Sequence, residues 1–325
     1  MKIAIVGTGA IGGYIGACLA RSGQAVTAIA RGATAAALRS HGWRVDSGGS
    51  RFSVPARVAT DVAQAGVHDV VIVAVKGPAM AEVAPMIRGM MHADTLVVPA
   101  MNGIPWWFGS HMHALGAAPL ESVDPHGRIL AILPASHVIG CVVHMAASVS
   151  EPGVVRHALG RRLILGEPSG AMTPRLAVIA DALRGAQLDA QTSPTIQRDI
   201  WYKLWGNMTM NPVSALTGAT MDRIVDDPLV SRFCLDVMAE AAEVGRAIGC
   251  TIEQSGEDRQ QVSRALGAVR TSMLQDVEGR RPLEIDALLT SVREIGARVG
   301  VATPGLDALT GLVRLKARTL GLYPG

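Results

Sequence analysis

The chain has 325 residues, enough for about two domains, and 49% of them are hydrophobic. Charged residues make up 18%, the formal net charge is +3, and no basic stripe is interleaved with aromatics, which excludes a nucleic-acid partner. No uncharged apolar run reaches the length of a membrane span, and the first residues lack a signal-peptide cleavage pattern. The four cysteines are widely spaced, which predicts buried thiols in a cytoplasmic protein.

The first residues predict a strand, a glycine turn and a helix in succession. The apolar strand Lys2–Val6 leads into Gly7-Thr8-Gly9-Ala10-Ile11-Gly12, and a helix over Ile11–Ser22 leads to a second strand, Ala25–Ala30. In a Rossmann fold this Gly-x-Gly-x-x-Gly turn places the pyrophosphate of a dinucleotide on a helix N-terminus, where backbone amides and the helix dipole favour an anion. We therefore predict a dinucleotide site, with a glycine-rich turn of another α/β protein as the alternative.

Arg31 follows the second predicted strand, where proteins that bind NAD normally have an Asp or Glu for the ribose 2′-hydroxyl. No acidic residue occurs between Met1 and Val45. A carboxylate would repel a 2′-phosphate, whereas a guanidinium can bind it with paired hydrogen bonds. The sequence thus favours NADP over NAD, and the alternative is a solvated loop arginine.

Strand and helix patterns continue to alternate through the first half of the chain. The predicted elements are strands at Val67–Val75, Thr95–Pro99 and Val138–Met145, two short strands at Val154–His157 and Arg162–Leu165, a helix at Thr173–Arg184 and an extended piece at Gln187–Thr192. After Ser193 the patterns are helical, at Ile196–Met210, Leu229–Ile248, Ser255–Leu266, Pro282–Val299 and Gly305–Leu320. We predict a Rossmann-type, doubly wound α/β domain over residues 1–192 and an all-α domain over residues 193–325.

Two polar features follow predicted strands of the first domain. Lys76 directly follows the predicted strand at Val67–Val75, and Asn102-Gly103 comes after the predicted strand at Thr95–Pro99. Because ligands of open α/β sheets bind beyond the carboxyl ends of the strands, we expect Lys76 and Asn102 to contact the coenzyme or the substrate. A solvated lysine and an ordinary Asn-Gly turn are the alternatives.

Lys203, Asn207 and Asn211 recur every four residues and share one face of a predicted helix. We expect that helix to end or bend at Pro212, because proline restricts the residue before it. Asparagines beside tryptophans are poor choices for a dry core, so a ligand with several oxygen atoms is expected to bind them. A polar face in contact with water is the alternative.

Hydride delivery to a ketone requires a proton donor at the carbonyl oxygen. All nine histidines lie at or before His157, so a histidine acid is excluded if the helical domain supplies the donor, and Lys203 is then the best candidate. His111 and His113 are interpreted as surface residues rather than a metal pair, because no third ligand accompanies them, and no metal site is expected.

With these residues in place, the chain resembles the ketopantoate reductase (2-dehydropantoate 2-reductase) family over nearly its whole length. The order of motifs carries the resemblance: Gly7–Gly12, Lys76, Asn102-Gly103, Lys203/Asn207/Asn211-Pro212, Ser272-Met273-Leu274-Gln275-Asp276 and Glu284-Ile285-Asp286. The resemblance implies NADPH-dependent reduction of a 2-oxo acid to a 2-hydroxy acid, as in pantothenate and coenzyme A biosynthesis.

The resemblance also implies roles for single residues. It assigns catalysis to Lys203 as the acid and to Glu284, which lies near the nicotinamide ribose in the family, and it assigns Asn102 to a contact shared by coenzyme and substrate. The implied substrate-binding residues are Asn102, Lys203, Asn207, Asn211 and, for the carboxylate, Ser272.

The chain departs from the family pattern near the expected substrate. It inserts Ile104-Pro105-Trp106-Trp107-Phe108 and a long loop through Pro125, and it has Met221 and Leu289 where many members have polar residues. We interpret these as a remodelled apolar wall that favours a bulkier 2-oxo acid than ketopantoate. Two other functions remain open: an NADP(H)-binding sensor or partner protein without turnover, and a two-domain dehydrogenase of 3-hydroxy acids or opines. The oligomeric state also stays open, with a homodimer through the helical domain as a candidate.

Overall fold

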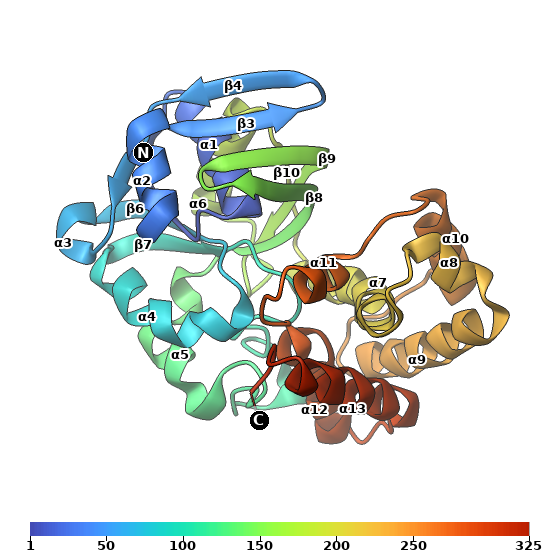
Figure 1. Ribbon diagram of the computed structural model, residues 1–325. Coiled ribbons are helices and arrows are strands. Elements are labelled where there is room, and N and C mark those ends of the chain that lie inside the picture. Colours follow the sequence, from blue (N-terminus) through green and yellow to red (C-terminus); the bar gives the residue numbers. More distant parts are fainter. Residues whose placement is uncertain (325) are drawn as a thin grey trace. The chain divides into compact units, whose positions relative to one another are not determined.

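The computed structural model describes residues 1–324, which form two compact units (Figure 1). The first unit comprises Met1–Met101 and Arg128–Ile196, and the second comprises Asn102–Gly127 and the chain from Gln197 onward. The sequence predicts a single boundary near residue 192. The structure differs because the segment at 102–127 packs with the helices of the second unit.

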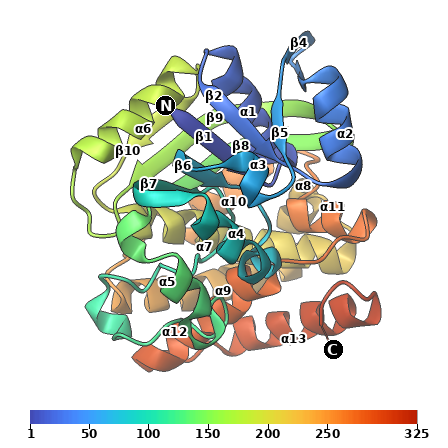
Figure 2. The same cartoon turned by 90° about the vertical axis from the view of Figure 1, so that its left-hand side faces the viewer.

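A five-stranded parallel sheet organises the first unit. Its order is β5 (Arg57–Ala59), β2 (Ala25–Ile29), β1 (Lys2–Val6), β6 (His68–Val73) and β7 (Met91–Pro99), and Figure 2 shows most of these strands side by side. With β1 in the middle, this is the Rossmann strand order 3-2-1-4-5, which lacks only the sixth strand in the described part of the chain. Residues Ile3–Ile5 and Val70–Val73 are buried because helices and a second sheet cover both faces.

The helices that connect the strands include several that the sequence patterns did not predict. They are α1 (Ala10–Arg21), α2 (Gly32–His41), α3 (Val62–Ala65), η1 (Gly77–Ala79) and α4 (Met80–Gly89). Of these, only α1 was predicted. Few large apolar side chains mark α2, whose buried residues are Ala35 and Leu38, so its helical periodicity is weak.

A second sheet completes the first unit. Its order is β10 (Asp189–Thr192), β9 (Val154–Gly166), β3 (Trp43–Ser47) and β4 (Ser50–Val54), with β8 (Gly140–Glu151) paired antiparallel to β9. The prediction of two short strands between residues 154 and 165 is wrong, because β9 is one long strand. It continues past Gly160, whose φ is +74°, by shifting its register against β8.

Helix α1 lies between the two sheets. A Cβ at Gly16 would come within 2.7 Å of the Trp43 ring from β3 and 3.1 Å of Ile5 from β1, and a Cβ at Gly13 would lie 2.7 Å from Val155 of β9. Glycine weakens a helix, but here it lets both sheets approach the helix backbone. One buried cluster accordingly joins α1, both sheets and α6 (Pro174–Gly185).

The second unit is mainly helical. It contains η2 (His113–Leu115), η3 (Pro125–Gly127), α7 (Ile196–Thr217), α8 (Met221–Asp226), α9 (Pro228–Ala247), α10 (Gly256–Ala265), α11 (Ser272–Glu278), the π-helix η5 (Asp286–Thr290), α12 (Ser291–Val299) and α13 (Pro304–Thr319). The first unit also holds α5 (Arg128–Ile132) and η4 (Ala135–His137).

The sequence predicts that the helix ends or bends at Pro212; helix α7 does not end there but continues to Thr217. Proline removes one helical hydrogen bond, yet Val213, Ser214 and Ala215 after it are all buried. Burial of this last turn outweighs the local preference to stop.

The four cysteines are free and buried, as predicted, and burial raises the pKa of the Cys234 thiol to about 12. Within residues 1–324, no helix is long and apolar enough to cross a bilayer.

Candidate functional site

The glycine turn between β1 and α1 packs tightly on the first unit's sheet except at Gly9. Gly7 has a φ of +91°, and a Cβ there would lie 2.7 Å from the carbonyl of Ala74. A Cβ at Gly12 would lie 2.1 Å from the carbonyl oxygen of Gly7. A Cβ at Gly9, in contrast, would meet no atom within 4 Å. The turn therefore leaves room beside Gly9, at the N-terminus of α1, where an anion is favoured.

A cavity of about 480 Å³ opens beside this turn. Its lining is Val6, Gly7, Thr8, Gly9, Ile29, Ala30, Arg31, Thr34, Thr60, Val75, Glu82, Val83, Met86, Val149 and Gly153. Four of the predicted coenzyme residues, Gly7, Thr8, Gly9 and Arg31, are thus brought together. The others are not among the lining residues. Ala10, Ile11 and Gly12 lie in the first turn of α1, Lys76 follows β6 and precedes η1, and Asn102 belongs to the second unit.

Arg31 and Glu82 form an ion pair within this cavity. Nη2 of Arg31 donates to Oε1 of Glu82 over 3.1 Å. Sequence reasoning missed Glu82, because it examined acidic residues only up to Val45. Glu82 lies in the first turn of α4, the helix that follows Lys76. Its position soon after the carboxyl end of a strand is the sequence signal that could have indicated it.

Lys203 and Asn102 are in direct contact in the second unit. Nζ of Lys203 donates a 2.8 Å hydrogen bond to Oδ1 of Asn102, and both side chains are half-buried. The next residue, Gly103, has a φ of +77°, and a Cβ there would lie 2.4 Å from the carbonyl oxygen of Ala287. Since Ile104 also donates its backbone N–H to Ala287 at 2.8 Å, the turn is fixed against η5.

The remaining predicted substrate residues are dispersed over three elements of the second unit. Asn207 is half-buried on α7, and Asn211, one turn later, is only 6% exposed. Ser272 is exposed at the start of α11. Glu284 is half-buried and lies shortly before η5 in the chain. One alternative interpretation of the face shared by Lys203, Asn207 and Asn211 is a polar surface in contact with water. The burial of Asn211 contradicts that alternative at the C-terminal end of this face.

Comparison with known proteins bears directly on this arrangement. The family model for ketopantoate reductase PanE/ApbA matches residues 3–170, and the model for its C-terminal part matches residues 195–317. The 2-dehydropantoate 2-reductase of Mesorhizobium japonicum is 39% identical over 99% of this chain and 100% of its own length. The chain belongs to the ketopantoate reductase family.

Solved structures of the family have the same fold. A protein from Ralstonia solanacearum MolK2, assigned as a ketopantoate reductase, is 58% identical with a TM-score of 0.96 over 99% of both chains. The 2-dehydropantoate 2-reductase of Geobacter metallireducens is 28% identical with a TM-score of 0.86, covering 97% of this chain and 100% of its own. The protein is thus an oxidoreductase that acts on a CH–OH group.

In this chain, the inserted aromatic residues belong to the core of the helical unit. Trp107 and Phe108 expose none of their surface, and the Phe108 ring stacks at 6.2 Å from that of Trp201 on α7. Leu289 is also fully buried. Because side chains without accessible surface cannot contact a substrate, the interpretation of these three residues as an apolar wall around it is wrong. Met221 is half-buried, and its part in such a wall stays a prediction.

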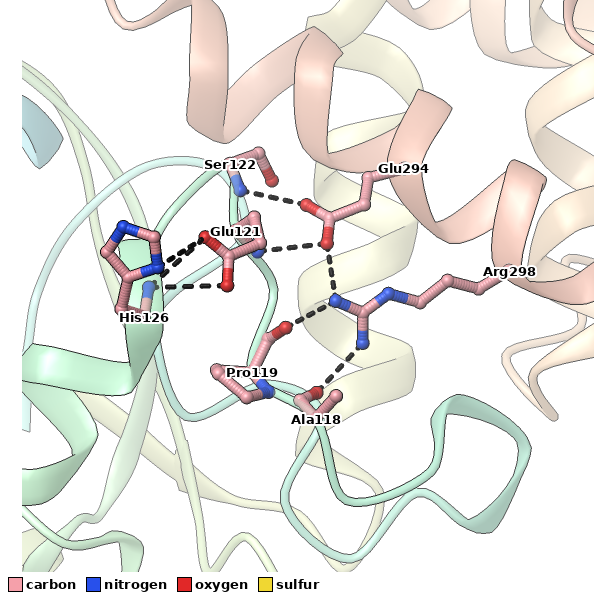
Figure 3. A network of polar contacts seen from close by, with 7 residues as sticks. All are labelled: Ala118, Pro119, Glu121, Ser122, His126, Glu294 and Arg298. Carbon is pink, nitrogen blue, oxygen red and sulfur yellow. Dashed lines mark hydrogen bonds and ion pairs between the residues drawn. The ribbon is translucent and has the colours of Figure 1, made fainter.

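The loop after these aromatics is held to α12 by hydrogen bonds to an ion pair, Glu294–Arg298, on that helix (Figure 3). The Glu294 carboxylate accepts hydrogen bonds from the backbone N–H groups of Glu121, at 2.9 Å, and Ser122, at 2.8 Å. Arg298 bonds the same carboxylate and donates to the carbonyls of Ala118 and Pro119. Burial alone would raise the pKa of Glu294, but the bonds from Ser122, Glu121 and Arg298 lower it below the ordinary value.

The segment at 102–127 also brings histidines into the unit that holds Lys203. His111, His113 and His126 lie in the segment at 102–127, so the second unit does contain histidines. All three are exposed, and His126 pairs with Glu121 of its own loop. Lys203 remains the candidate acid because of its contact with Asn102, rather than because histidine is absent from the unit.

Proposed function

We propose that this protein reduces 2-dehydropantoate, a 2-oxo acid, to pantoate with NADPH. The observation that carries the proposal is the 2.8 Å hydrogen bond from Lys203 to Asn102, which joins a proton donor to an amide of the Asn-Gly turn. Family membership and the name of the Mesorhizobium relative support the substrate.

The cavity of the first unit suits the coenzyme. Gly9 leaves space at the N-terminus of α1 for the pyrophosphate, and Arg31 with the hydroxyls of Thr34 and Thr60 would hold the 2′-phosphate. Apolar residues such as Val83 and Met86 would pack on the adenine. When bound, NADPH supplies the hydride. Lys76, between β6 and η1, and Asn102 are proposed to contact the coenzyme as well.

The second unit would hold the 2-oxo acid. The Lys203 ammonium stabilises the negative charge that develops on the carbonyl oxygen and gives that oxygen a proton. Asn102 accepts one of the ammonium's hydrogen bonds and thereby fixes its direction. Asn207 and Asn211 would donate amide N–H groups to substrate oxygens, Ser272 would bind the carboxylate, and Glu284 would orient Lys203 and the coenzyme ribose.

The test follows the absorbance of NADPH across a panel of 2-oxo acids that includes 2-dehydropantoate, with 3-oxo acids and imine-forming pairs of amino and oxo acids as comparison. Oxidation that is fastest with 2-dehydropantoate is expected. Fastest turnover with a 3-oxo acid or an imine would instead identify a 3-hydroxy acid or opine dehydrogenase. NADPH binding without oxidation of any member would identify a sensor and overturn the proposal.

A further inference from the structure

Glu82 places a carboxylate where the proposed 2′-phosphate would bind. Among the described residues that line the coenzyme cavity, it is the one acidic side chain, and its Oε1 lies 3.1 Å from Nη2 of Arg31. Arg31 lies between β2 and α2, and Glu82 lies in the first turn of α4, so the pair connects these two places in the first unit. Arg31 therefore already has an anionic partner in the protein itself.

We propose that Glu82 is a specificity-determining residue, which competes with the 2′-phosphate for Arg31 and narrows the preference for NADPH over NADH. The inference rests on the proposed function, because it assumes that Arg31 faces the 2′ position. A phosphate monoester carries a charge near −2 and is repelled by a carboxylate that shares its cation. The 2′-hydroxyl of NADH is neutral and can donate a hydrogen bond to a carboxylate.

The exposure of the pair limits the size of the effect. The side chains of Arg31 and Glu82 are 74% and 66% exposed, so water screens their attraction and Arg31 can exchange one partner for another. Repulsion between Glu82 and a nearby phosphate is screened in the same way. We therefore expect Glu82 to weaken binding of the 2′-phosphate by about threefold to tenfold, rather than to prevent it.

Glu82 also has a structural role that the test must separate from binding. It lies in the first turn of α4, where a carboxylate interacts favourably with the helix dipole. A change in folded fraction would affect all adenine nucleotides equally. The ratio of two affinities measured on one protein sample is not affected.

The experiment compares adenosine 2′,5′-bisphosphate with AMP, which differ only in the 2′-phosphate, by calorimetric titration of the full chain. Glu82→Gln is expected to raise the ratio of their affinities by about threefold to tenfold relative to the unaltered protein. A matched control is Glu243→Gln, which removes the same charge from an exposed pair with Arg246 on α9, outside the cavity lining. This control is expected to leave the ratio unchanged.

A Glu82→Gln ratio equal to or below that of the unaltered protein would overturn the role of Glu82. Arg31→Gln tests the underlying assignment separately, since it is expected to lower the same ratio. If Arg31→Gln leaves the ratio unchanged, the proposed 2′-phosphate site is wrong and the inference about Glu82 fails with it. If Arg31→Gln lowers the ratio but Glu82→Gln does not raise it, only the inference about Glu82 fails.

Discussion

Lys203 and Asn102 are 101 residues apart in the chain, yet the lysine Nζ lies 2.8 Å from the asparagine Oδ1. Asn102 opens the segment that packs with the helical unit, and Lys203 lies within its first helix, α7. The proposed acid and its partner thus come from two separate stretches of one compact unit, and the geometry of their contact depends on how the first stretch is anchored.

Replacing Lys203 with Met should abolish most turnover while leaving the coenzyme cavity intact. The change removes the group that stabilises and protonates the developing alkoxide, so kcat is expected to fall by about a hundredfold to ten-thousandfold. The Kd for NADPH, measured by fluorescence, should change by less than about threefold. Turnover close to normal would remove Lys203 from the proposed mechanism.

Lys316→Met is a matched control for the loss of a lysine from the same unit. Nζ of Lys316 donates to the carbonyls of Ala215 and Leu216, at 2.8 and 2.6 Å, in the last turn of α7. The free energy of unfolding in urea should fall by about 1.5–3 kcal/mol, because these carbonyls lose a cationic partner at a helix C-terminus. At a temperature where the variant stays folded, kcat is expected to be retained.

Gly9→Ala should weaken coenzyme binding without affecting stability. The added methyl meets no protein atom within 4 Å, so it would enter the space that we propose for the pyrophosphate. We expect the Kd for NADPH to rise at least about tenfold, equivalent to about 1.4 kcal/mol. Gly185→Ala at the end of α6, where a Cβ also meets nothing, is the control and should leave the Kd unchanged. Equal affinities in both variants would contradict the proposed position of the pyrophosphate.

Gly103→Ala should reduce both stability and turnover. Its φ of +77° disfavours alanine, and the Cβ would lie 2.4 Å from the Ala287 carbonyl oxygen, so the turn that carries Asn102 must move. Gly116 has a similar φ of +69° with open space around it, and Gly116→Ala therefore isolates the backbone strain, about 1–3 kcal/mol. We expect kcat to fall in Gly103→Ala only. Identical kcat values for the two variants would show that the anchoring of Asn102 is unimportant.

The hydrogen bonds that Glu294 accepts from the loop at Glu121 and Ser122 should make part of the free energy of unfolding depend on pH. The folded protein holds the pKa of Glu294 below its ordinary value of 4.5, so the ionised form is favoured by folding. Its contribution is complete above about pH 4.5 and is lost as the pH falls through the lowered pKa. Urea unfolding should show Glu294→Gln to be less stable by about 1–3 kcal/mol at pH 7. The difference should shrink towards pH 3, and a difference independent of pH would refute this origin.

Much of the coenzyme half of the protein could be predicted from sequence, because its signals are local. The strand, turn and helix from Lys2 to Ser22 follow one another directly, and the structure places Gly7, Gly9 and Arg31 at one cavity. Lys203, Asn207 and Asn211 needed only the period of a helix to be assigned to a common face.

The errors of prediction arose where distant segments meet. Phe108 packs with Trp201, and no local pattern indicates that a loop after β7 joins the helical unit. Glu82 is likewise an ordinary helix residue in sequence, and its role depends on its distance from Arg31. Pro212 predicts a helix end or a bend from local preference, but the helix continues because its next turn is buried.

The packing of Phe108 on Trp201, with Trp107 buried beside it in the chain, also has a consequence for synthesis of the protein. On the ribosome, Trp107 and Phe108 emerge about ninety residues before Trp201, a delay of roughly 5–20 seconds at ordinary elongation rates. Throughout that interval the nascent first half carries large apolar groups that its own sheets cannot cover. Chaperone dependence of the newly made chain should therefore be greatest before α7 has been translated.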